Sequence, residues 1–200
     1  EYINKIERFG HWKDTALMLE GPAVDTFLVL FLQMWTYSHE LLDVTSYMVE
    51  HEGFDTPGFV VPYGDKPLDK DKVGENVYID ILNHARDFVH IMTPYLILDG
   101  ELLHALKFAA ERGVDVSIIM PGIPDKKSVY YLAKTYYPTL LASGVKIYEY
   151  TPGFIHAKVF VSDNSRAVVG TINLDYRSLY HHFECATYLY RTSSVVGIEE

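Results

Sequence analysis

Short apolar runs alternate with amphipathic segments of helical length from Phe59 onward, and this alternation limits the possible folds more than any other feature of the chain. It predicts these elements in chain order: strand 59–63, charged loop 64–72, helix 76–86, strand 88–92, helix 99–112, strand 114–120, helix 126–143, strand 145–150, a hairpin of 155–161 with 167–172, strand 183–190, and a helix from Thr192. Asp99 is expected to cap the second helix, and Pro138 to kink the third. The pattern predicts an α/β domain with layers, in which helices flank a mixed β-sheet.

The segment before this alternation has a different character. Residues 12–20 are predicted to form a strand, and Pro22 to begin a helix that extends to Ser38. Apolar residues cover most of that helix, so it is expected to be buried on nearly all sides. A turn-rich stretch, 52–58, follows. It is interpreted as the boundary between a first unit, 1–52, and a second, 53–200.

Charge and composition exclude several classes of function. The formal net charge of −10 argues against a general nucleic-acid binder, and no nucleic-acid partner is expected. The longest strongly apolar run, 23–35, is too short to cross a bilayer. Cys185 is the only cysteine, so the chain has no intrachain disulfide and no thiolate metal cluster, and this cysteine is expected to pack in the core.

The predicted hairpin carries the residues with the clearest chemistry. On a strand, His156 and Lys158 point to the same face, and Asn173 follows the returning strand, where its amide could reach that face. Gly170 permits a close backbone approach. Imidazole, ammonium and amide together suit a phosphate group, which the imidazole can attack or protonate. Asp163 falls at the hairpin turn, where fixing the turn or pairing with a cation is more plausible than nucleophilic attack.

Other polar residues are candidate ligands or partners of this group. Glu184 is a candidate to orient an imidazole, although the sequence gives no distance between it and His156. His181 and His182 precede it, but no further residues have metal-ligand spacing, so no metal and no cofactor are expected.

A faint internal repeat relates the two ends of the chain. Asp14 begins an apolar segment followed by a helix, and Glu184 does the same 170 positions later. If the repeat is real, the chain begins near the end of one copy and contains most of a second. By this repeat Asp14 corresponds to Glu184.

The full spacing, H-x-K-x4-D followed by G-x2-N, resembles the HKD motif of the phospholipase D superfamily. Over nearly the whole chain the sequence is similar to bacterial cardiolipin synthases. The matching segments are 1–5, 9–15, 61–65, 93–96, 121–127, 148–158, 170–178 and 182–184.

The resemblance implies a phospholipase D-like fold and a phosphatidyltransferase that makes cardiolipin and glycerol from two phosphatidylglycerol molecules. One motif histidine would attack phosphorus to form a phosphohistidine, and the other would act as acid and then base. By position, His156 is the histidine of the second motif, and the resemblance leaves open whether it is the nucleophile or the acid. The catalytic set is His156, Lys158, Asp163 and Glu184, with Glu184 orienting His156. His156, Lys158 and Asn173 would bind the phosphate.

The chain departs from the family pattern in one large respect. Members of this type carry a first HKD motif just upstream of the segment that begins here, and N-terminal membrane helices; neither is in this sequence. His11 and Lys13 form a second H-x-K, but Met18 and Leu28 occupy the aspartate and asparagine positions, so it is not the first motif. Asp14 would then orient a histidine that this chain lacks.

Expectations about partners and location follow from that departure. The expected partners are anionic phospholipids, the first HKD domain, and the membrane through N-terminal segments. The complete protein is expected at the bacterial cell membrane, and this fragment is expected to be soluble and inactive alone. Two alternatives stay open: a phosphodiesterase or nuclease with one motif per chain that works as a homodimer, and a fragment with an assembly role and no catalysis.

Overall fold

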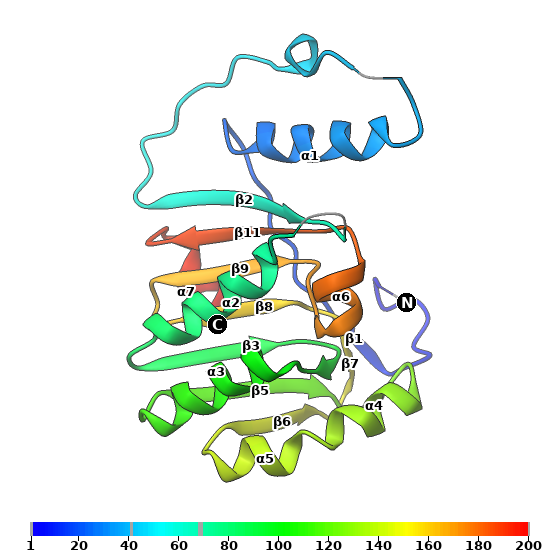
Figure 1. The fold of residues 1–200 in the computed structure, drawn as a ribbon, viewed down its shortest axis with the longest axis vertical. Helices are drawn as coiled ribbons and strands as arrows, with labels where there is room; N and C mark the ends of the chain where they lie inside the picture. Colours follow the sequence, from blue (N-terminus) through cyan, green and yellow to red (C-terminus); the bar gives the residue numbers. More distant parts are fainter. Residues whose placement is uncertain (1, 41, 68–69, 200) are drawn as a thin grey trace.

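A seven-stranded mixed sheet organises the chain in the computed structural model, which describes residues 2–40, 42–67 and 70–199 (Figure 1). From one edge to the other the strands are β2 (Phe59–Asp65), β11 (Glu184–Tyr190), β9 (Arg166–Gly170), β8 (Val159–Ser162), β3 (Phe88–Met92), β5 (Asp115–Pro121) and β6 (Lys146–Tyr150). β3, β5 and β6 run parallel to one another, and the remaining neighbours are antiparallel. The predicted fold class, a mixed sheet flanked by helices, is confirmed.

Helices on both faces of the sheet bury its apolar side chains. One face carries α2 (Val73–His84), α3 (Gly100–Glu111) and α5 (Tyr137–Ala142), while α7 (Ser194–Glu199) lies against β8 and β9 on the other (Figure 1). Side chains alternate between the two cores along each strand: on β8, Phe160 joins the larger core, while Val159 and Val161 join the smaller one.

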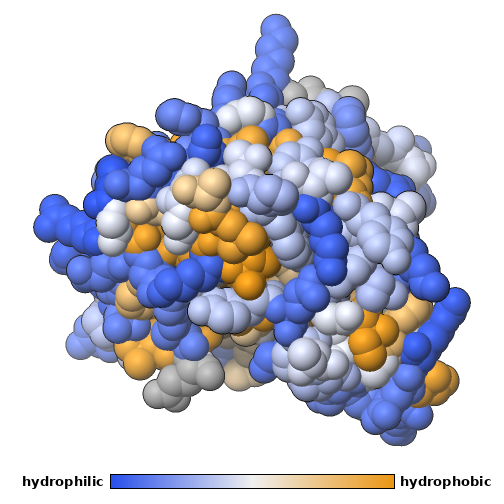
Figure 2. Space-filling model, turned by 90° about the horizontal axis from the view of Figure 1, so that it is seen from below, coloured by the Kyte–Doolittle hydropathy of each residue, from blue (hydrophilic) through white to orange (hydrophobic). Residues whose placement is uncertain are grey.

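The predicted 126–143 helix is two helices, α4 (Lys127–Lys134) and α5, with Pro138 in the first turn of α5. A proline fits there because the first amide groups of a helix have no partner within it. At the end of the molecule where α4 and α5 lie, patches of hydrophobic residues are separated by hydrophilic residues on the surface (Figure 2). Leu132 and Leu141 of these helices are exposed.

Two short parallel strand pairs lie outside the main sheet, and neither their pairing nor the short helix that follows one of them was predicted. β1 (His11–Lys13) pairs with β7 (Gly153–Ile155), and β10 (Leu174–Asp175) with β4 (Leu96–Ile97). α6 (Tyr176–His181) begins directly after β10, where the side chain of Asp175 caps it. These elements hold the loops at one end of the sheet, where the candidate site lies.

The strand predicted over 12–20 is wrong beyond Lys13. A strand persists only where a neighbour supplies backbone hydrogen bonds, and within the described residues β1 finds that neighbour in β7 for three residues only. The segment that follows runs without regular structure to α1 (Val24–Thr36).

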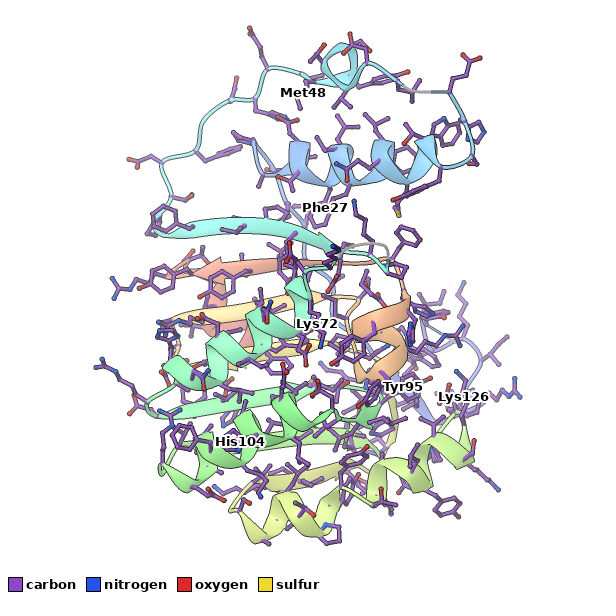
Figure 3. All side chains as sticks on the ribbon, viewed as in Figure 1. Phe27, Met48, Lys72, Tyr95, His104 and Lys126 are labelled. Atoms are coloured by element: carbon purple, nitrogen blue, oxygen red, sulfur yellow. The ribbon has the colours of Figure 1, made fainter. Side chains whose placement is uncertain are left out.

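α1 confirms the predicted helix but is less buried than its composition suggests. It lies along the outer side of β2, with Phe27 placed between the two, and the segment with the short 3₁₀ helix η1 (Val44–Tyr47) passes over it (Figures 1 and 3). Only Leu32 is buried, and Phe31 and Trp35 are exposed. The expectation of burial on nearly all sides is therefore wrong within this chain, and one apolar side of the helix faces solvent.

A cluster of acidic side chains joins three helices. Glu75, fully buried at the start of α2, lies with Asp99, the N-cap of α3, around the hydroxyl of Tyr180 from α6. Burial, followed by the hydrogen bond with Asp99, raises the pKa of Glu75 to about 7. Between pH 4.5 and about 7 the folded protein therefore keeps a proton on Glu75 and Asp99, whereas the unfolded chain has released it.

This proton makes the free energy of unfolding depend on pH. The folded pKa of Glu75 lies above the ordinary value of 4.5, so its contribution to stability is complete below that pH and is lost as pH rises to about 7. Glu75→Gln is neutral in both states and is expected to flatten the pH dependence of urea unfolding between these values. The matched control is Glu101→Gln, an exposed residue of the same cluster, which should keep the wild-type slope. An unchanged slope in Glu75→Gln would contradict the shared proton.

Candidate active site

The pairing of β1 with β7 sets the position of His156. The amide N–H of His156 donates to the carbonyl of Lys13 at 2.8 Å, directly after the register Lys13 with Ile155. Gly153 permits this approach, because a Cβ there would lie 2.2 Å from the carbonyl oxygen of His11. Two segments 142 positions apart are thereby held side by side, and Asp14 comes to the imidazole.

Asp14 is the carboxylate that contacts His156. Its Oδ2 lies 2.9 Å from His156 Nδ1, and the indole N–H of Trp12 donates to the same oxygen at 3.4 Å. Burial opposes the charge, but the hydrogen bonds from His156 and from the Thr15 amide prevail and lower the pKa of Asp14. A carboxylate at Nδ1 fixes the tautomer that leaves Nε2 as the basic nitrogen. The structure thus corrects the predicted partner of His156, which is Asp14 and not Glu184.

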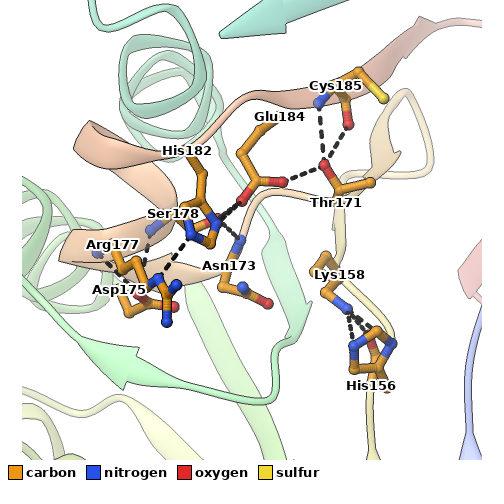
Figure 4. A network of polar contacts seen from close by, with 10 residues as sticks. All are labelled: His156, Lys158, Thr171, Asn173, Asp175, Arg177, Ser178, His182, Glu184 and Cys185. Carbon is orange, nitrogen blue, oxygen red and sulfur yellow. Dashed lines mark hydrogen bonds and ion pairs between the residues drawn. The ribbon is translucent and has the colours of Figure 1, made fainter. Parts of the chain in front are cut away.

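Lys158 lies against the same imidazole. Its Nζ is 2.9 Å from both ring nitrogens of His156, and it also donates to the carbonyl of His156 (Figure 4). Lys158 is only 8% exposed, and desolvation lowers its pKa to about 8. Desolvation, and then the charge of Lys158, lower the pKa of His156. The carboxylates of Asp14 and Glu184 offset only part of the desolvation of Lys158, and a phosphate at this ammonium would offset more of it.

The predicted hairpin strand 155–161 is interrupted at this point. Residues 156–158 belong to neither β7 nor β8, so His156 and Lys158 lie in the irregular connection between these two strands. The main chain of β9 closes over them: Gly170 N donates to the Lys158 carbonyl at 3.3 Å. A Cβ at Gly170 would lie 2.4 Å from Cβ of Ala186, so the close approach expected there is confirmed.

Asn173 follows β9 in the same region. Its backbone N–H donates to Ser178 Oγ at 2.8 Å, while its side-chain Oδ1 is buried and finds no hydrogen-bond partner among the described residues (Figure 4). Tyr78 of α2 holds this segment by donating to the carbonyl of Ile172 at 2.8 Å. A buried amide with an unsatisfied polar atom suits a ligand, because an unpaired polar group is costly in a protein alone.

Glu184 belongs to a neighbouring network. It accepts hydrogen bonds from Thr171 Oγ1 and from Ser178 Oγ, the latter at 2.6 Å, and its Oε1 lies 3.3 Å from Nδ1 of His182 (Figure 4). The His182 ring accepts a hydrogen bond from Arg177 Nε at 2.7 Å. Ser178 therefore links Glu184 to the backbone of Asn173, a role that the sequence did not reveal.

Asp163 lies at the far end of β8 from His156. Its carboxylate accepts from the amide groups of Arg86, Asp87 and Phe88 at 2.9–3.0 Å. Burial opposes the charge, yet these three bonds lower the pKa of Asp163. The structure corrects its inclusion among the catalytic residues: it fixes the turn and the start of β3, as its position in the hairpin indicated.

A shallow open depression joins the central groups. Its wall is formed by residues from the β1, β7 and β9 ends: Asp14, Thr15, Ala16, His156, Lys158, Gly170 and Thr171. At its rim the aromatic rings of Trp12 and Tyr2 contact the imidazole. Nearby, Tyr95 donates to Asp125 Oδ2 at 2.7 Å, and Lys126 lies over the Tyr95 ring (Figure 3).

One group of acidic residues within the described chain has ligand atoms close enough for a metal ion. Glu75, Asp99 and Glu101 place these atoms within 4.8 Å of one another. Lys72 Nζ lies 3.4 Å from Glu75 Oε2, and Glu75 and Asp99 share a proton, so two positive charges already offset part of the negative charge of this cluster. It lies apart from the depression around His156.

The depression can hold an anion between an ammonium and an oriented imidazole, at the strand ends of a mixed α/β sheet.

The fold of this chain is that of phospholipase D-like proteins. Nuc, a phospholipase D family member from Salmonella typhimurium, matches with a TM-score of 0.54 at 19% identity over 69% of this chain and 89% of its own. Phosphatidylserine synthase of Haemophilus influenzae matches with a TM-score of 0.56 at 19% identity over 70% and 37%.

The sequence comparisons define the family within that fold. The model described as cardiolipin synthase, PLD-like domain, matches residues 78–199. The chain belongs to this family.

Curated relatives cover nearly all of the chain. An uncharacterized protein of Streptococcus mutans serotype c is 66% identical over 100% of this chain and 43% of its own length. Cardiolipin synthase of Alkalihalophilus pseudofirmus is 38% identical over 99% and 40%, and cardiolipin synthase 2 of Bacillus anthracis is 41% identical over 98% and 38%. The chain thus spans about two fifths of the length of these relatives.

Proposed function

We propose that this chain supplies one half of the active site of a phosphatidyltransferase that makes cardiolipin and glycerol from two phosphatidylglycerol molecules. The observation that carries the proposal is the contact of His156 with both Asp14 and Lys158. The Asn173 amide, whose buried Oδ1 has no hydrogen-bond partner among the described residues, is proposed to join them in binding the phosphate. Family membership supplies the reaction class. The chain spans only part of the named relatives, so the activity is proposed for the longer protein.

Each side chain has a separate task in the proposed reaction. Lys158 binds a phosphate oxygen with its ammonium group, and a half-turn of the Asn173 amide presents Nδ2–H to a second oxygen. Asp14 holds Nδ1 of His156, so Nε2 carries the chemistry. The imidazole that carries its proton on Nδ1 can act as a nucleophile through Nε2, or as an acid once Nε2 is protonated.

The transfer proceeds in two displacements. One imidazole attacks phosphorus, the P–O bond to the leaving glycerol breaks, and a second imidazole donates a proton to the alkoxide. That second imidazole then removes the proton of an incoming phosphatidylglycerol hydroxyl, which attacks phosphorus and releases the first imidazole. The chain supplies one of the two, His156.

The second imidazole is proposed to come from the part of the longer protein that lies outside this sequence. The repeat that matches Asp14 with Glu184 supports this, because Asp14 orients a histidine of the other repeat copy. By the same relation, Glu184, held by Thr171 and Ser178, would orient the histidine of the counterpart. Residues 1–52 are accordingly proposed to be the end of a first phospholipase D-like unit, and 53–200 to form the second.

The proposed substrate requires access to a membrane. No helix in the described part of the chain has the length and apolar character needed to span a bilayer. We propose that the longer protein is held at the bacterial cell membrane by segments outside this sequence, where it meets phosphatidylglycerol and other anionic phospholipids.

The test compares this chain with the corresponding longer protein in vesicles containing phosphatidylglycerol. The longer protein is expected to form cardiolipin and glycerol in equal amounts, whereas this chain as a monomer forms neither. Sedimentation of the same samples establishes the oligomeric state. Cardiolipin formation by the monomeric chain at the rate of the longer protein would contradict the two-half site, and activity confined to a homodimer would favour one motif per chain.

A further inference from the structure

An apolar groove lies between α1 and the β2 edge of the sheet. Leu30 and Met34 of α1 form one wall with Tyr37, which directly follows the helix, and Gly64 of β2, Cys185 of β11 and Phe183 just before β11 face them. The polar side chains of Gln33, Asp65 and Lys66 also line the groove. Its cavity volume is about 270 Å³. This is just below the range of about 300–1,000 Å³ that is usual for sites of whole small molecules, so the groove can take a part of a ligand such as one apolar chain.

The wall residues follow from helix periodicity and from one glycine. Positions 30 and 34 lie one turn apart on one face of α1, and Tyr37 follows at the end of the helix. Gly64 lets that face approach β2, because a Cβ there would lie 2.6 Å from Cδ2 of Leu30. Met34 and Phe183 are each 45% exposed, so apolar surface in the groove is available to an apolar ligand.

The groove is next to the site of the proposed reaction. Glu184 and Thr171 lie among its lining residues, and Thr171 also lines the depression around His156 and Lys158. A single ligand could therefore place an anionic group at Lys158 and an apolar group beside Met34. A phospholipid has this combination of an anionic diester and apolar chains.

We propose that this groove binds an acyl chain of the phospholipid whose phosphate is held at His156 and Lys158. The inference rests on the proposed function for the position of the phosphate, and it adds the position of the acyl chain. α1, from the first of the two proposed units, would thereby bind the substrate on which the second unit acts.

The experiment measures dissociation constants of this chain for dioctanoyl- and dihexanoyl-phosphatidylglycerol below their micelle concentrations, and for the deacylated diester. Each methylene that enters the groove is expected to tighten binding by up to about fourfold. Binding should therefore strengthen by at least about tenfold from the diester to the dioctanoyl lipid. Met34→Gln should remove most of that gain. The matched control is Phe31→Gln on the same helix, which is exposed, does not line the groove, and should keep it.

Two results would overturn the groove. The acylated lipids could bind no more tightly than the diester, or Met34→Gln and Phe31→Gln could weaken lipid binding equally. Lys158→Ala separates the groove from the proposed function. Lipid affinity that is unchanged in Lys158→Ala but lowered in Met34→Gln would mean that the groove binds the acyl chain while the phosphate lies elsewhere. The proposed function would then fail, and the groove proposal would stand.

Discussion

Replacing His156 by alanine in the longer protein is expected to lower cardiolipin synthesis by about 10⁴-fold or more. The imidazole is one of two groups that move protons or bond to phosphorus in the proposed reaction, and the loss of such a group removes most of the catalysis. The measurement is the initial rate of cardiolipin formation in phosphatidylglycerol vesicles, with the amount of folded protein checked by circular dichroism.

The matched control for this substitution is His181→Ala. His181 is an exposed histidine of α6, outside the depression, and its loss should change the rate by no more than about twofold. A His156→Ala protein that is folded and keeps the wild-type rate would show that this half of the protein has an assembly role only.

Asp14→Asn is expected to lower the same rate by about 10²- to 10⁴-fold. The amide can present N–H to Nδ1 of His156 and so favour the wrong tautomer, as in the Ser-His-Asp triad, where the equivalent change costs about 10⁴-fold. Asp14 also raises the pKa of His156 against the effects of burial and Lys158. The limb of the pH–rate profile that reports this histidine, acidic if His156 is the nucleophile and basic if it is the acid, should therefore move to lower pH.

The movement of the pH profile distinguishes orientation from a loss of folding. Glu20→Gln, an exposed carboxylate in the same irregular segment, is the control and should leave both rate and profile unchanged. A pure loss of stability would lower the rate of Asp14→Asn with an unchanged profile, and that result would contradict the role of Asp14.

The alternation of apolar runs predicted the main sheet because each strand carries its own pattern. β3 matches the predicted 88–92, and Asp99 caps α3 as expected, with its side chain accepting from the amide of Leu102 at 2.8 Å. These features depend on neighbouring residues only. β1, β4, β7 and β10 are two or three residues long, and no periodicity can arise over so few positions.

The motif predicted the composition of the site but not its pairing. His156, Lys158 and Asn173 are recognisable from spacing, whereas the partner of His156 depends on the parallel register of β1 with β7 across the whole chain. The repeat identified Asp14 as an orienting acid and assigned it to a histidine outside the chain. The signal that would have found the contact is the adjacency of Asp14 to His11–Lys13, a short edge strand.

Binding of an anion by this chain tests the phosphate site most directly, since it requires no second histidine. Desolvation lowers the pKa of Lys158 to about 8, although the charges of Asp14 and Glu184 act to raise it, so bound glycerophosphoglycerol should raise that pKa and bind less tightly as pH increases through about 8. NMR of labelled lysine, histidine and asparagine side chains is expected to show saturable shifts at Lys158, His156 and Asn173 together. A titration in which Lys158 keeps its pKa and these three signals stay unchanged would contradict the site.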